Sequence, residues 1–185
     1  ASSENRIAIV QFGSGSNNHD STAWVNTGFY NTDKGTTRIG QNTASTDDYK
    51  AALFSSDKFD TVRNIINNLS EGTCDKVAEN GMTMANNILK NSGSSYDSTG
   101  DRNACVILLT DNAAQYRNGT QAWALSNSTV MNAKDIKGLG AYIYTVRIGS
   151  HTHTDVDVGD YLSAVSSNYI DAKSISERGL KNMSG

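Results

Sequence analysis

The chain contains no proline and only two cysteines among its 185 residues. Without proline, helix ends and turns must come from glycine, asparagine and aspartate, and sixteen glycines supply most of them. Two cysteines are too few to hold together a fold of this size through disulfides. The stability of the fold must therefore come from the burial of a hydrophobic core.

Long apolar runs and excess positive charge are also missing. No stretch approaches the roughly 20 apolar residues of a membrane-spanning helix, so membrane insertion is not expected. Sixteen Lys and Arg against nineteen Asp and Glu give a net charge of -3, the wrong sign for neutralising nucleic-acid phosphates. Charged residues make up only 19% of the chain, and its richness in Ser, Thr and Asn favours an extracellular, cell-surface protein.

Three segments have the continuous apolar character of strands that are buried on both faces. They cover residues 6–12, 104–110 and 141–148. Helical spacing predicts four helices between and after them, and their approximate ranges are 57–71, 77–91, 121–138 and 161–165. A weaker apolar cluster near Phe29 and Tyr30 is typical of a short edge strand.

Alternation of buried strands and helices predicts an α/β fold. We expect a single domain, residues 1–185, with a three-layer, doubly wound and mostly parallel sheet and helices on both faces. Ligands of such sheets bind beyond the carboxyl ends of the strands. Cys74 should lie in a loop at that rim and Cys105 at the far end of its strand, roughly 20 Å away, so two free thiols are expected, with Cys105 buried.

Four blocks in this order resemble the von Willebrand factor type A domain. The blocks are Arg6-Ile-Ala-Ile-Val-Gln-Phe12, Gly72-Thr73 followed by Gly81-Met-Thr-Met-Ala-Asn-Asn-Ile-Leu89, Val106-Ile-Leu-Leu-Thr-Asp111, and Ala133 to Val146. The segment 161–169 is similar to versions found in surface and pilus adhesins of Gram-positive bacteria.

The resemblance implies a divalent cation, Mg²⁺ or Mn²⁺, at the rim of the sheet. Family members hold it through a DxSxS sequence after the first strand, a Thr and an Asp, which match Thr73 and Asp111 here, with Asp75 as the alternative to Thr73. Hydroxyls and few carboxylates leave a hard cation short of negative charge, so it recruits a carboxylate from the partner. The implied partner is a protein or extracellular-matrix ligand.

The sequence departs from the family pattern at its first strand. Residues 6–12 match the second strand of the family, so the DxSxS strand would precede Ala1, and a last strand and helix would follow Gly185. An alternative register makes Phe12 to Ser16 a degenerate DxSxS with Phe in place of Asp. In the first register the domain is incomplete at both ends. A strand from outside these residues, or from a neighbouring subunit, would then fill the place between residues 6–12 and 104–110.

Two functions follow as expectations. The first is an extracellular adhesion module that binds its partner through the cation. The alternative is a metal-free structural subunit of a surface filament or pilus, completed by a strand from a neighbouring chain. An enzyme is not expected, because the sequence shows neither a nucleophile elbow nor a phosphate loop. His151 and His153 alternate with polar residues in a segment that is more typical of a solvated loop.

Overall fold

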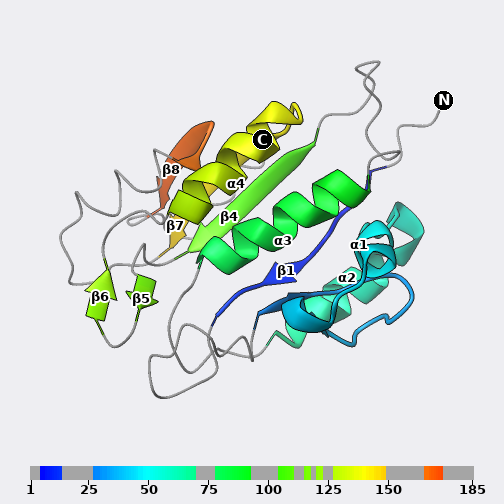
Figure 1. Cartoon of the computed structure of the whole chain (residues 1–185). Helices are drawn as coiled ribbons and strands as arrows, with labels where there is room; N and C mark the ends of the chain where they lie inside the picture. The colour runs from blue at the N-terminus through cyan, green and yellow to red at the C-terminus, as the bar shows by residue number, and fades with distance from the viewer. Residues whose placement is uncertain are drawn as a thin grey trace.

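The computed structural model describes residues 5–13, 27–69, 78–92, 104–110, 115–117, 120–122, 127–148 and 165–172. These residues form a mixed α/β fold (Figure 1). Its strands are β1 (Val10–Gln11), β2 (Gly28–Phe29), β3 (Ile39–Gly40), β4 (Cys105–Thr110), β5 (Gln115–Arg117), β6 (Thr120–Ala122), β7 (Tyr142–Ile148) and β8 (Asn168–Ala172). Its helices are α1 (Thr46–Lys50), α2 (Phe59–Asn67), α3 (Ala78–Asn91) and α4 (Asn127–Gly138), with 3-10 turns at Gln41–Thr43 and Ser56–Lys58.

A parallel sheet in the order β4-β7-β8 forms the second half of the fold. β4 pairs with β7 from Cys105 opposite Tyr142 to Thr110 opposite Arg147, and α4 connects the two strands. The predictions of strands at 104–110 and 141–148 are therefore confirmed. β8, which pairs in parallel with β7, was not predicted, because its five residues mix polar and apolar side chains.

The first half of the fold is a small antiparallel sheet in the order β1-β2-β3. The prediction of a strand buried on both faces at 6–12 is wrong in two respects. Only Val10–Gln11 is regular strand, preceded by a bridge between Ile7 and Phe54, and both of its residues are half-buried. The polar end of Gln11 is accommodated because its side-chain oxygen accepts hydrogen bonds from Tyr30 and Arg38.

Helices cover both faces of this first sheet. Successive residues of a strand point to opposite faces. Accordingly, Val10 packs in the cluster that contains Met84 and Ile88 of α3, whereas Ile9 packs against Val62 and Ile65 of α2. The residues of β1 thus pack against α2 on one side and against α3 and Tyr49 of α1 (Thr46–Lys50) on the other.

The parallel sheet is covered on one face by α3 and α4. Leu108 of β4 and Ile143 of β7 are buried there together with Met82 and Ile136 of the two helices. On the opposite face, Ile107 is 60% exposed, Leu109 54% and Tyr142 53%. Within the described residues, the expected helices on both faces are thus found for β1-β2-β3 but not for β4-β7.

Several local predictions need correction. Cys105, predicted to be buried, is an exposed free thiol, because it lies on the face of β4 that none of the described helices covers; Cys74 lies outside the described residues. Residues 121 and 122, predicted as the start of a helix, belong to β6 and pair with β5, and α4 begins only at Asn127. Helix α1 was not predicted, although Ser45 and Asp48 form a capping box at its start.

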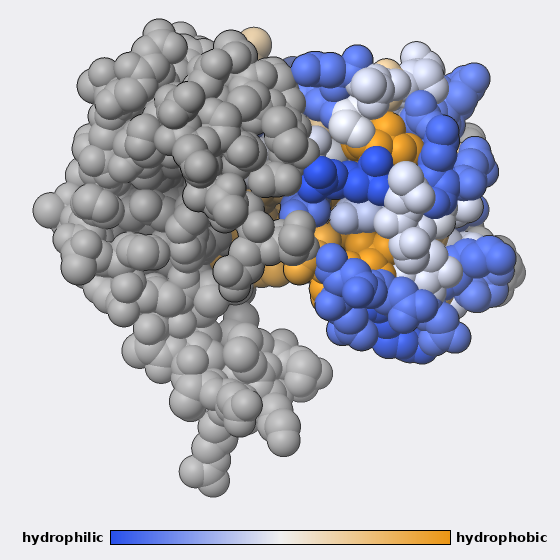
Figure 2. Space-filling model, turned by 90° about the horizontal axis from the view of Figure 1, so that it is seen from below, coloured by the Kyte–Doolittle hydropathy of each residue, from blue (hydrophilic) through white to orange (hydrophobic). Residues whose placement is uncertain are grey.

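The predicted helices at 57–71 and 77–91 are confirmed as α2 and α3. Ile66 and Leu69, which belong to the apolar stripe of the first helix, are nevertheless exposed. Seen from below, the described surface is largely hydrophilic, with hydrophobic residues visible between the polar ones (Figure 2). No helix in the described ranges is long and apolar enough to cross a membrane.

Candidate functional site

The carboxyl ends of the strands define the rim at which the sequence predicts a site. In Figure 1, β1 and β4 run in the same general direction, and β7 is parallel to β4. The carboxyl ends of β1, β4 and β7 therefore lie toward the same side of the described fold. Asp111 follows the last residue of β4 in the sequence, but its placement, like that of Thr73 and Asp75, lies outside the described residues. The same holds for His151 and His153.

The end of β1 is held by two hydrogen bonds to a buried threonine. The Thr27 hydroxyl donates to the carbonyl oxygen of Gly13 at 2.6 Å and accepts from the Gly13 amide at 3.0 Å. Thr27 is fully buried, so these bonds have no competition from water. The chain is thereby fixed where the polar segment after Phe12 begins.

Phe12 belongs to the core and not to a polar rim. Its ring packs against the cluster of α3, α4 and β4 residues, and a Cβ on Gly81 of α3 would lie only 2.8 Å from it. A side chain in this place cannot substitute for a cation-binding carboxylate. Phe12 therefore supplies no ligand in the alternative register, whose Ser14 and Ser16 lie outside the described residues.

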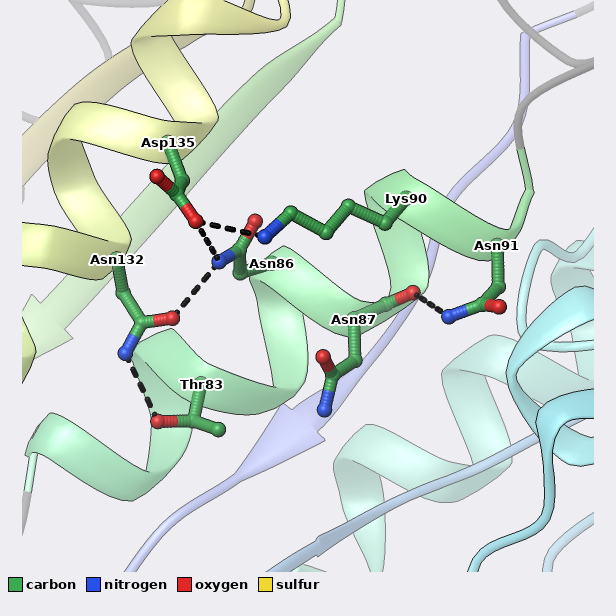
Figure 3. Close-up of polar contacts among 7 residues, drawn as sticks. All are labelled: Thr83, Asn86, Asn87, Lys90, Asn91, Asn132 and Asp135. Carbon is green, nitrogen blue, oxygen red and sulfur yellow. Dashed lines mark hydrogen bonds and ion pairs between the residues drawn. The ribbon is translucent and has the colours of Figure 1, made fainter.

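The most extensive polar cluster of the described residues is a seam between α3 and α4 (Figure 3). Asn86 donates to the side-chain oxygen of Asn132 at 2.8 Å and to Asp135 at 3.3 Å. Asn132 donates in turn to the Thr83 hydroxyl at 3.0 Å, and Lys90 donates to Asp135 at 2.6 Å. We call these five residues the α3–α4 seam.

Charge and burial differ along the seam. Asn86 is 3% exposed, and its side-chain oxygen has no hydrogen-bond partner in the structure. Lys90 and Asp135 are about half exposed at the outer end. The pKa of Asp135 is held below its ordinary value. The hydrogen bond from Lys90 is the largest cause, and the hydrogen bond from Asn86 is the next.

The seam was not recognised from the sequence. Its signal is helical spacing: Thr83, Asn86 and Lys90 follow one another at intervals of three and four residues, and Asn132 and Asp135 at three. Such spacing places polar groups on one helix face without showing that two helices bring them together. The seam joins helices through hydrogen bonds, and it contains no nucleophile that a neighbouring base activates.

A second polar anchor holds the turn after β2. The fully buried Asn31 donates to the Asp48 carboxylate at 3.2 Å and accepts from the Lys34 amide at 2.8 Å. The pKa of Asp48 is lowered, mainly by the hydrogen bond from the backbone of Ser45. These contacts attach the turn to the start of α1, so they are structural.

Among the described residues, no group of three or more His, Cys, Asp or Glu side chains could hold a metal ion. Of the predicted ligands, only Asp111 directly follows a described strand end, Thr110 of β4, and Asp111 and Thr73 themselves lie outside the described residues. Searches against known proteins add no assignment, because no protein-family model matches the chain and no curated protein resembles it in sequence.

Proposed function

We propose that this chain is an extracellular adhesion module of the von Willebrand factor A type. It would bind a protein or extracellular-matrix partner at the carboxyl edge of a three-layer, doubly wound sheet. The observation that supports this most is the parallel β4-β7-β8 ladder, whose first strand ends at Thr110, directly before Asp111. Parallel sheets carry their ligands beyond this edge.

A divalent cation is part of this proposal. The Asp111 carboxylate and the Thr73 hydroxyl are oxygen donors, which suit the hard cations Mg²⁺ and Mn²⁺. One carboxylate and one neutral hydroxyl compensate only one of the two positive charges of the cation. A carboxylate of the partner would complete the coordination, so the chain acts by binding and not by catalysis.

Isothermal titration calorimetry with Mn²⁺, on a chain that also includes the DxSxS strand implied by the family resemblance, tests the cation site. We expect this extended chain to bind Mn²⁺, and Asp111→Ala to weaken binding by tenfold or more, since a carboxylate contributes the charge of the site. Thr73→Ala should weaken binding less, because a hydroxyl is neutral. Asp33→Ala, which removes an exposed aspartate of the turn after β2, is the matched control.

The outcome of the titration is decisive in two ways. Absence of Mn²⁺ binding by the extended chain without substitutions would contradict the cation site. Equal loss of affinity in Asp111→Ala and Asp33→Ala would show that binding depends only on general negative charge.

A second candidate function, a structural subunit of a surface filament or pilus, is favoured by the strand edges. β1 is the first strand of its sheet and β4 the first of the other, and the described residues show no pairing between them. Both strands lie under α3 and run in the same general direction (Figure 1). A strand from a neighbouring chain, added between them, would join the two sheets.

Two features favour such pairing: the backbone groups at a strand edge and the exposed apolar side chains of β4. A strand at the edge of a sheet offers backbone N–H and C=O groups with which a further strand can pair. β4 also presents Ile107 and Leu109 to solvent. An apolar strand of this kind at a sheet edge promotes association unless another element covers it.

Sedimentation velocity over a range of protein concentrations tests the second candidate. We expect concentration-dependent assemblies that Ile107→Lys reduces at least severalfold, because the charge opposes burial of β4. Ile66→Lys alters an isoleucine of α2 that is also exposed, and it should leave assembly unchanged. Assemblies that persist in EDTA and in Asp111→Ala would separate this function from cation-dependent adhesion.

A wild-type chain that remains monomeric at all concentrations would contradict the filament function. The same conclusion would follow if both lysine variants reduced assembly equally, because association would then reflect general surface hydrophobicity.

A further inference from the structure

We draw no further inference here: the strongest candidate, the apolar face of β4 and β7 that bears Cys105, Ile107, Leu109 and Tyr142, carries none because nothing in the structure shows what covers it.

Discussion

Gly81 determines how closely α3 approaches β1. A Cβ at this position would lie 2.8 Å from Cδ1 and 3.2 Å from Cβ of Phe12. Because the near end of the Phe12 side chain is involved, rotation of the ring alone does not relieve the contact. The absence of a side chain at Gly81 therefore outweighs the lower helix propensity of glycine, which is worth about 1 kcal/mol relative to alanine.

Gly81→Ala is expected to destabilise the protein. Overpacking costs about 1–3 kcal/mol, and the gain in helix propensity offsets about 1 kcal/mol of this. The net loss in the free energy of unfolding should thus reach up to about 2 kcal/mol, measured by urea denaturation.

Two further variants separate overpacking from a general effect of alanine. Gly138→Ala lies at the end of α4 with nothing within 4 Å of the new Cβ, so it should be neutral or slightly stabilising. In a Phe12→Ala background, Gly81→Ala should cost less than in the wild type. An equal cost in both backgrounds would show that contact with Phe12 is not the cause.

At the scale of the elements, the α3–α4 seam fixes two helices that pack on the same face of the parallel sheet. Its buried end consists of neutral hydrogen bonds, whereas its outer end is the ion pair of Lys90 and Asp135. An exposed ion pair contributes little to the free energy of unfolding at neutral pH. That contribution can be measured as the stability lost when acid protonates the aspartate.

Acid is expected to weaken the seam. The pKa of Asp135 is lower in the folded chain than the ordinary value of about 3.9 for an unfolded chain. Its stabilising contribution is therefore complete above that ordinary pKa and is lost as the pH falls through the folded-state pKa. The free energy of unfolding, measured in urea from about pH 6 to about pH 2, should fall less steeply in Asp135→Asn than in the wild type.

Lys90→Gln provides an independent check of this pH effect. It removes the largest cause of the lowered pKa, so it should also flatten the acid limb. Part of the slope should remain in both variants, because the pKa of Asp48 and that of Asp57 are lowered as well. An unchanged slope in Asp135→Asn would refute a contribution of the seam to acid stability.

At the scale of the whole molecule, α3 is the element that the two sheets share. Met84 and Ile88 belong to the cluster around Phe29 of β2. Met82 and Leu89 belong to the cluster around Leu108 of β4. Because both sides of one helix are buried, neither sheet has a complete core without it, and we expect the two halves to unfold together.

Ile88→Ala tests this coupling. Removal of a buried isoleucine side chain costs about 2–5 kcal/mol. If unfolding is cooperative, native-state hydrogen exchange should show loss of protection in β4 and β7 as large as that in β2. Ile66→Ala, at an exposed position of α2, should change protection by no more than about 0.5 kcal/mol. Loss confined to β1-β2-β3 would mean that the two halves unfold independently.

Some elements were predictable because their residues leave few alternatives. Every residue from Val106 to Leu109 is apolar, so a strand was expected there, and the apolar spacing of α2 and α3 is helical. The hairpin of β5 and β6 was also predictable. Asn118-Gly119, a dipeptide typical of hairpin turns, lies in the sequence between the paired residues Arg117 and Thr120. β3, with two residues, is too short to show a period.

The candidate site was predicted only through resemblance to a family. Asp111 and Thr73 were assigned as cation ligands because they lie in two of the sequence blocks that resemble the family. Their placement remains a prediction. The seam could not be predicted, because Asn86 and Asn132 are 46 residues apart in the sequence. Spacing within each helix specifies a polar face, but it does not specify which helix lies opposite.

Local spacing and apolar runs were enough to predict α2, α3, β4 and β7, because they decide backbone conformation over short stretches of chain. Contacts between distant segments are what bury Leu108 while Ile107 and Cys105 stay exposed, pair β1 antiparallel with β2, and pack α3 against both sheets. Burial depends on what packs against a side chain, and the packed residues come from segments far apart in the chain.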